Sequence, residues 1–566
     1  MNNPEQVTYF ADTDSRNRRV RFGIKSEDRT RHVYVIGKTG MGKSTVIENM
    51  AAQDIRNGNG FAFIDPHGKA AELLLEYIPK ERIKDVIHFA PFDMEHPIAF
   101  NIMEDVGYDK RHLVVSGLMS TFKKIWVDTW SARMEYILAN TLMALLEYPG
   151  ATLIDVSRMY SDKVYRKKVV DNIKDPSVKS FWIDEYAKYT DRFAAEATPA
   201  IQNKIGQFTS NPLIRNIIGQ EKSSFDFREV MDERKIVIIN LSKGRMGEMN
   251  ANLLGSMLIT KIYLAALSRA DVSDRELDNL PNFYLYVDEF QSFANESFAG
   301  ILSEARKYKL NLTIAHQYIE QMSDEVRAAV FGNVGTMITF RVGSYDAEVL
   351  EKEFAPAFTS EDIVNLGAFQ IYLRLMIDGI GSKPFSARTI PPLERQDVSF
   401  VDDIIQHSRE RYGNRREEVE ALILEKTKPS EESKKEKNDK KNNDRGNYNN
   451  SNKKTNNERR SNKERRAIEP DVAEQLKAAI KTGKVKEEKK EVSLSDMTLL
   501  TQNGNSSERK KKEPSTENSN ALRDALKGVI GNVETKEKKV EKQEKKKIDN
   551  SPKEIPEKEL KDILGI

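Results

Sequence analysis

The chain of 566 residues contains no cysteine. Disulfide bonds, zinc sites with thiolate ligands and cysteine nucleophiles are therefore excluded, which suits a reducing compartment. The seven histidines are scattered and lack the spacing of metal ligands. No apolar run approaches the length that crosses a bilayer, and the polar first 31 residues are unlike a signal peptide. We expect a cytoplasmic protein that is at most recruited to the inner face of the cell membrane.

Aromatic side chains are almost absent from the last quarter of the chain. From Thr427 to Ile566 there are 36 basic residues, 27 acidic residues and one aromatic residue, Tyr448. The first 426 residues hold 54 basic and 61 acidic residues. A segment with so few apolar side chains cannot offset the entropy that it would lose on folding. We therefore expect a folded, mildly acidic body and a disordered basic tail, residues 427–566.

Strand-like and helix-like segments alternate over much of the body. Residues 1–30 predict a lead-in hairpin from VTYF and RVRFGI. Residues 31–108 and 227–426 contain short apolar segments separated by helical patterns: HVYVI, FAFID, DVIHFAP, KIVIINL, FYLYVDEF, LNLTIAH, GTMITFRV and QIYLRLMI. This alternation predicts an α/β fold with a mostly parallel sheet and helices on both faces. Residues 109–226 show amphipathic helical patterns instead, so we expect an all-α insertion domain there.

The segment GKTGMGKST fits the phosphate-loop pattern G-x-x-x-x-G-K-[ST] at every fixed position. It follows a predicted strand and begins a predicted helix, which is the context that the motif requires. Its backbone N–H groups would wrap the phosphates, Lys43 would reach the β- and γ-phosphates, and Ser44 would bind Mg²⁺. The expected cofactors are ATP and Mg²⁺, because no guanine signature N-K-x-D follows. The predicted nucleotide-binding residues are Gly37, Lys38, Thr39, Gly40, Met41, Gly42, Lys43, Ser44 and Thr45.

Two acidic residues, Asp288 and Glu289, end the apolar strand FYLYV. Such a pair is costly unless a metal ion or hydrogen bonds compensate for it. Asp288 is predicted to hold Mg²⁺, and Glu289 is predicted to polarise the attacking water. Gln317, which follows the strand LTIA, could sense the γ-phosphate. Asp65 in FIDPHG could face the same site, although a Pro-His-Gly turn explains it better.

The order of these motifs resembles that of type IV secretion coupling proteins and related conjugative DNA-transfer ATPases, which are HerA/FtsK-type DNA pumps. The resemblance covers residues 22–393 and rests on GKTGMGKST, FIDPHG, IVIINLSKG, YLYVDEFQSF, ARKYKLNLTIAHQ and ITFRVGSYDAEVL. It implies a RecA-like P-loop NTPase motor that assembles as a homo-hexamer and moves DNA without sequence specificity. It also implies that the all-α domain meets the relaxase complex.

The resemblance also assigns site residues. It places the catalytic roles on Lys43, Glu289 and Gln317, with Arg306 as the arginine finger of a neighbouring subunit. Arg341 is a second candidate for the finger, and spacing alone would make Arg306 a solvated helix residue. Two alternatives remain open: an ATPase that drives protein secretion or pilus assembly without DNA, and an ATP-dependent assembly scaffold.

Typical coupling proteins begin with transmembrane helices, which this sequence lacks. The chain is then either a soluble relative closer to the HerA translocases or a protein that docks on a membrane-anchored secretion-channel protein. Three apolar segments of the tail are candidates for docking, and transient helices without a partner are the alternative. They are DVAEQLKAAIKTG, NALRDALKGVIG and KELKDILGI.

We predict that deletion of residues 427–566 abolishes membrane recruitment and leaves ATP hydrolysis unchanged, because all predicted nucleotide residues precede the deletion. Sedimentation of the full and shortened chains with membranes that contain the secretion channel measures recruitment. Undiminished sedimentation of the shortened chain would contradict the docking role.

Overall fold

The computed structural model describes residues 3–14, 19–189, 191–295 and 297–428, except for the side chains of residues 191–197. The three apolar segments of the tail and its predicted disorder lie outside the described residues.

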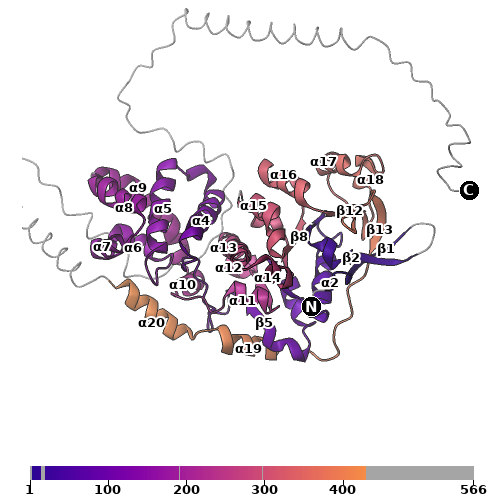
Figure 1. Cartoon of the computed structure of the whole chain (residues 1–566), viewed down its shortest axis with the longest axis horizontal. Coiled ribbons are helices and arrows are strands. Elements are labelled where there is room, and N and C mark those ends of the chain that lie inside the picture. The colour runs from indigo at the N-terminus through magenta and orange to yellow at the C-terminus, as the bar shows by residue number, and fades with distance from the viewer. Residues whose placement is uncertain (1–2, 15–18, 190, 296, 429–566) are drawn as a thin grey trace, which may run out of the picture. The chain divides into compact units, whose positions relative to one another are not determined.

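The described chain contains an eleven-stranded sheet. Its strands β1, β2, β5, β8 and β13 are labelled in Figure 1. Its strands follow the order β2-β1-β13-β10-β9-β3-β8-β7-β4-β6-β5. The strands from β9 to β5 pair in parallel, whereas β10, β13, β1 and β2 add an antiparallel edge. The prediction of a mostly parallel α/β fold is therefore confirmed. The bounds are β1 (Val7–Thr13), β2 (Arg21–Lys25), β3 (Val33–Ile36), β4 (Gly60–Asp65), β5 (Val86–Phe89), β6 (Ile236–Asn240), β7 (Phe283–Val287), β8 (Leu310–His316), β9 (Thr336–Thr339), β10 (Gln370–Arg374) and β13 (Phe385–Thr389).

Helices cover both faces of the sheet, so the central strands β3, β4, β6, β7, β8 and β9 are buried along their whole length. In β3 alternate side chains enter different cores: Tyr34 and Ile36 lie on one face, and Val33 and Val35 on the other. The helices α2 (Lys43–Arg56) and α3 (Lys69–Leu75) pack on the second face. The first face is covered by α13 (Glu248–Leu267), α15 (Ser297–Glu304), α16 (Asp324–Asn333) and α17 (Ser344–Phe354).

Between β5 and β6 the described chain forms helices. These are η3 (Tyr108–Lys110), α4 (Arg111–Ile125), η4 (Val127–Thr129), α5 (Ala132–Leu146), α6 (Asp155–Ser161), α7 (Lys163–Asn172), α8 (Pro176–Ser180), η5 (Phe181–Glu185), η6 (Tyr186–Lys188), α9 (Asp191–Thr209), α10 (Pro212–Ile218) and α11 (Phe227–Asp232). Several begin at an Asp, Asn or Ser cap, such as Asp162 before α7. The division of the chain into domains stays a prediction.

The remaining elements are short, except for two helices near the end of the described chain. The first of these, α19 (Val401–Tyr412), packs beside β5, and α20 (Arg416–Thr427) packs against α10. Lys426 of α20 forms an ion pair of 3.2 Å with Asp155 in the helical region. The short elements are α1 (Ser26–Arg29), η2 (Lys80–Asp85), α12 (Lys243–Met246), η7 (Ser268–Asp271), α14 (Asp274–Asn279), η8 (Phe290–Ser292), η9 (Ala305–Tyr308), η10 (Ile319–Gln321), α18 (Ser360–Val364), β11 (Met376–Ile377) and β12 (Ile380–Gly381).

The expectation that no apolar run approaches a spanning length was wrong for one segment. By length and composition, Glu248–Asp271 could cross a membrane, and within the described residues it is the one helix that could. The structure buries 67% of its apolar window. The helix α13 packs between the sheet and the helices α4 and α11, which explains why it is apolar on all sides.

A buried ion pair fixes one end of α2. Arg29 donates two hydrogen bonds of 2.9 Å to the carboxylate of Asp54, and both side chains are at most 1% exposed. The same guanidinium donates to the hydroxyls of Thr8 and Tyr286 and lies 3.7 Å from the ring centroid of Tyr284. This network therefore joins β1, α1, α2 and β7.

We predict that Asp54→Asn lowers the free energy of unfolding by about 3–5 kcal/mol, because it leaves a buried arginine without its counter-charge. The shift of the urea midpoint of the full chain measures this loss. Asp12→Asn is the matched control, because it removes the partner of the more exposed Arg21 and should cost less than about 1 kcal/mol. Equal shifts in the two variants would contradict the role of the buried pair.

Candidate functional site

The predicted site residues other than Arg306 gather where parallel strands of the sheet end. In the register of the sheet, Ile36 of β3 pairs with His316 of β8, and Val287 of β7 pairs with Ile314. The phosphate loop follows β3, Asp288 follows β7 and Gln317 follows β8. The polar side chains therefore meet at the carboxyl edge of the sheet, where ligands bind in open α/β folds.

The loop between β3 and α2 has the backbone geometry of a phosphate cradle. Gly40 and Gly42 have φ values of 78° and 117°, which L-residues with side chains rarely adopt. The ammonium group of Lys43 donates to the carbonyl oxygens of Gly37, at 2.7 Å, and Lys38, at 3.3 Å. Burial lowers the pKa of Lys43, and the nearby carboxylates of Glu289 and Asp288 oppose this effect. The Lys43 ammonium group and the N-terminus of α2 therefore both lie at the phosphate loop, where they favour a bound anion.

Ser44 of the phosphate loop and Asp288 after β7 lie side by side. The Ser44 hydroxyl donates to Oδ2 of Asp288 at 3.2 Å. Burial, with the charges of Glu289 and Asp65, raises the pKa of Asp288 to about 6. A cation beside these crowded carboxylates would relieve their repulsion.

Mg²⁺ fits this donor set. It prefers oxygen ligands and usually takes one or two of them from the protein, with phosphates and waters completing the octahedron. In the described chain, no group of three or more His, Asp or Glu side chains could hold a metal ion. The Ser44 hydroxyl and the Asp288 carboxylate, which lie side by side, would hold Mg²⁺ together with the substrate, and the ion would neutralise charge on the phosphates.

Glu289 is held in an unusual conformation. Its φ of 47° places a non-glycine residue in the left-handed region, which is uncommon and often found at functional sites. Its carboxylate accepts hydrogen bonds from the side-chain amides of Gln317 and Gln291. Thr39 of the phosphate loop donates to Oε1 of Gln317 at 3.2 Å. The loop and Glu289 are thus connected through one amide.

The FIDPHG segment forms a turn at the same edge. Asp65 accepts hydrogen bonds from the backbone N–H groups of His67, at 2.7 Å, and Ala71, at 3.0 Å. These bonds support the turn interpretation. Asp65 nevertheless contributes negative charge at Asp288, and the exposed His67 ring lies 4.0 Å from the Glu289 carboxylate.

The two candidate arginines lie at opposite ends of the parallel strands: Arg306 at their amino ends and Arg341 at their carboxyl ends. Arg306, in η9, precedes β8 and is exposed at the amino edge, away from the phosphate loop of its own chain. Partial burial and the charge of Arg31 lower its pKa. Arg341 follows β9, and its carbonyl oxygen accepts from the Lys38 N–H at 2.8 Å. The structure therefore brings Arg341, but not Arg306, to the loop of the same subunit.

Sequence reasoning missed three residues that the structure places here. His316 is fully buried, bonds to the Tyr34 hydroxyl at 3.0 Å and has a pKa that burial lowers to about 3. Gln291 holds Glu289, and the motif DEFQ could have indicated it. Phe369 lies against Gly42, and no local pattern marks it.

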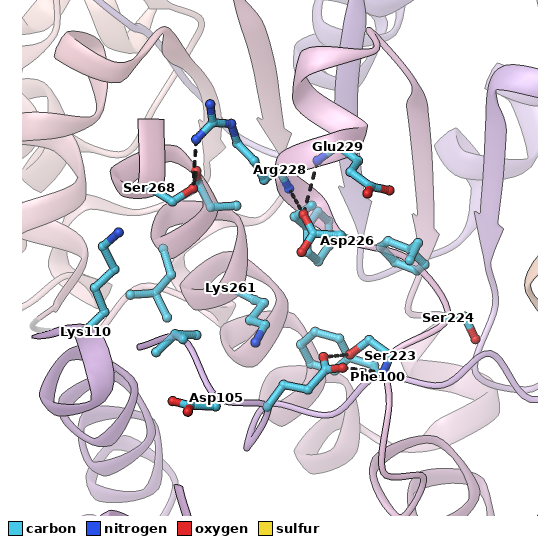
Figure 2. Close-up of a pocket in the computed structure, with 16 residues that line it drawn as sticks. Phe100, Asp105, Lys110, Ser223, Ser224, Asp226, Arg228, Glu229, Lys261 and Ser268 are labelled. Carbon is cyan, nitrogen blue, oxygen red and sulfur yellow. Dashed lines mark hydrogen bonds between the residues drawn. The ribbon is translucent and has the colours of Figure 1, made fainter. Parts of the chain in front are cut away.

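A pocket of about 510 Å³ lies elsewhere, where the helical region joins the sheet-containing part (Figure 2). Its walls come from the segment before α4, the start of α11 and the end of α13. Burial lowers the pKa of Lys261 in this pocket, while Glu104, Asp226 and Asp105 counter that shift. None of the lining residues belongs to the phosphate loop, so this pocket is separate from the candidate site.

The geometry of the site and the match to a known protein family indicate the same class of protein. A phosphate loop after β3, with an acid pair after β7 and a glutamine after β8, is the arrangement of a P-loop NTPase. Residues 20–367 match the family described as type IV secretion-system coupling protein DNA-binding domain. Because this match covers more than half of the chain, the chain belongs to that family.

Similar individual proteins are more distant. The type 4 coupling protein DotL of Legionella pneumophila is 20% identical over 398 residues, which are 59% of this chain and 50% of DotL. The chain therefore spans about half the length of this relative.

Solved structures of the plasmid coupling protein TrwB share the fold. TrwB in complex with ADP and Mg²⁺ is 13% identical, with a TM-score of 0.51 over 69% of this chain and 97% of TrwB. TrwB with the GTP analogue GDPNP is 14% identical, with a TM-score of 0.51 over 70% and 92%. Because these sequence identities are low, the similarity to TrwB shows a shared fold and nothing beyond it.

Proposed function

We propose that the chain is a Mg²⁺-dependent ATPase that translocates DNA in type IV secretion or conjugative transfer. The observation that carries this proposal is the meeting of the phosphate loop, Ser44–Asp288 and Glu289–Gln317 at one edge of the sheet. Membership of the coupling-protein family, whose matched domain is described as DNA-binding, supports the DNA substrate. The binding of nucleotide and Mg²⁺ by TrwB supports the same cofactors here.

The side chains divide the reaction between them. The loop and Lys43 hold the β- and γ-phosphates, and Ser44 and Asp288 hold Mg²⁺. Glu289 accepts a proton from a water that attacks the γ-phosphorus, and the bond to the β–γ bridging oxygen breaks to give ADP and phosphate. Gln317 bonds to both Thr39 and Glu289. Loss of the γ-phosphate would therefore change the position of Gln317 relative to the phosphate loop and to Glu289.

The assembly proposed is a homo-hexameric ring in the cytoplasm, with DNA contacted through its phosphates without sequence specificity. The helical region, residues 109–226, would meet the relaxase complex, and the tail would reach a membrane-anchored secretion-channel protein. The exposure of Arg306 at the amino edge supports its action on the nucleotide of a neighbour, because it cannot serve its own loop from there.

We predict that single- or double-stranded DNA stimulates ATP hydrolysis by the full chain, and that Glu289→Gln abolishes the hydrolysis. Removal of a catalytic base lowers rates by about 10²–10⁴-fold. Steady-state phosphate release with and without DNA, over a range of salt concentrations, measures both effects. Glu325→Gln, on the exposed surface of α16, is the matched control and should retain activity.

The outcomes separate the candidate functions. Hydrolysis that depends on Glu289 but ignores both kinds of DNA would contradict translocation of DNA and favour an ATPase for protein secretion or pilus assembly. Binding of ATP with hardly any turnover would favour an assembly scaffold.

A mixing experiment tests the shared site. We predict that Lys43→Ala and Arg306→Ala are each inactive, and that a mixture regains part of the activity. In mixed rings, an intact loop meets an intact Arg306 at some interfaces, and an arginine finger contributes about 10³–10⁵-fold to the rate. Mixing Lys43→Ala with Glu289→Gln is the control, because both changes affect the same half of the site. An inactive first mixture, in rings shown to exchange subunits, would contradict the role of Arg306.

A further inference from the structure

The order of the strands fixes the direction in which a bound triphosphate would run. On one side of β3 lie β8 and β7, which carry Gln317 and Glu289, the groups that act at the γ-phosphate. On the other side lie β9 and β10. With its β-phosphate in the loop and its γ-phosphate beside Glu289, a nucleotide would extend its nucleoside toward β9 and β10.

Phe369 lies on that side of the loop. It immediately precedes β10, which runs antiparallel to β9 and so begins at the carboxyl edge of the sheet. Its N–H donates to the carbonyl oxygen of Met41 in the phosphate loop at 3.1 Å, and its own carbonyl accepts from the Thr389 N–H at 2.9 Å. A Cβ added to Gly42 would lie 3.0 Å from Cδ1 of Phe369, so the edge of the ring packs on the loop.

The ring is nevertheless exposed and its backbone is strained. Phe369 keeps 43% of its surface accessible, although it is held from both sides by backbone hydrogen bonds. Its φ of 65° is a genuine outlier for a bulky residue. Residues kept in such conformations cluster at ligand clamps and active sites. An apolar ring fixed in this way, beside a phosphate cradle, offers an open aromatic face to a ligand.

We propose that the exposed face of Phe369 packs against the purine base of the bound nucleotide. This inference rests on the proposed function, because it needs a nucleotide in the loop. A base presents a π-face to an aromatic side chain whatever its edge groups are. The contact therefore adds affinity for purine nucleoside triphosphates without separating ATP from GTP. The alternative role for Phe369 is to brace the loop by packing on Gly42.

Titration calorimetry of the full chain with three Mg²⁺-bound ligands tests the proposal: ATP, GTP and inorganic tripolyphosphate. Tripolyphosphate carries the same phosphate chain but no base. We expect Phe369→Ala to weaken ATP and GTP about tenfold, or about 1.4 kcal/mol, and to leave tripolyphosphate binding unchanged. Phe369→Tyr keeps a ring and should keep the affinity. Tyr9→Ala is the matched control, because Tyr9 is also 42% exposed but lies on β1.

The contrary outcomes are distinct. If Phe369→Ala weakens all three ligands equally, the ring braces the loop and the base contact is wrong. If it weakens none of them, Phe369 has no role in binding, and the inference fails while the proposed function stands. If the unaltered chain binds neither ATP nor tripolyphosphate, the proposed function fails and the inference fails with it.

Discussion

The parallel pairing of β3 with β8 on one side and β9 on the other is the constraint on which the candidate site depends. Parallel strands end at a common edge, so whatever follows them is brought together by the sheet. The loop, Asp288, Glu289 and Gln317 come from segments that are up to 280 residues apart in the chain, as Gly37 and Gln317 show. A shift of β8 against β3 by one residue would turn Gln317 away from Glu289, because alternate residues face opposite sides.

The helix α2 connects the phosphate loop to the buried Arg29–Asp54 ion pair. It begins beside Gly42 in the loop and ends near Asp54, which the buried Arg29 holds against β1 and β7. The first turn of α2 is therefore positioned by contacts at both ends of the helix. At the loop, burial and the charges of Glu289 and Asp65 raise the pKa of Asp288, and at the far end the Arg29–Asp54 pair holds the helix in place.

Much of the fold could be predicted because buried parallel strands are short apolar runs. Four such runs were predicted to be strands for this reason, and each forms a strand: HVYVI, FAFID, KIVIINL and LNLTIAH. The strand β13 was missed because it alternates polar and apolar residues at an antiparallel edge, where Ser386 and Arg388 are not fully buried. The segment QIYLRLMI was expected to form one strand, but it divides into β10 and β11.

The sequence predicts those parts of the candidate site whose geometry a local motif determines. It does not predict the contacts that depend on how distant strands pair. The phosphate-loop pattern positions Lys43 and Ser44 locally, and an acid pair after a strand is visible in the sequence. The contact of Thr39 with Gln317 depends on the register of β3 and β8, and the place of Phe369 depends on the pairing of β10 with β9. Neither pairing has a local signal.

An experimental structure of the full chain with Mg²⁺ and a non-hydrolysable ATP analogue is the most direct test of the proposed nucleotide site. We expect the terminal phosphate to lie within hydrogen-bonding distance of Lys43 and Gln317, and the metal ion to contact the Ser44 hydroxyl and the Asp288 carboxylate. An analogue bound away from the loop, or bound with its terminal phosphate toward β9, would contradict this site.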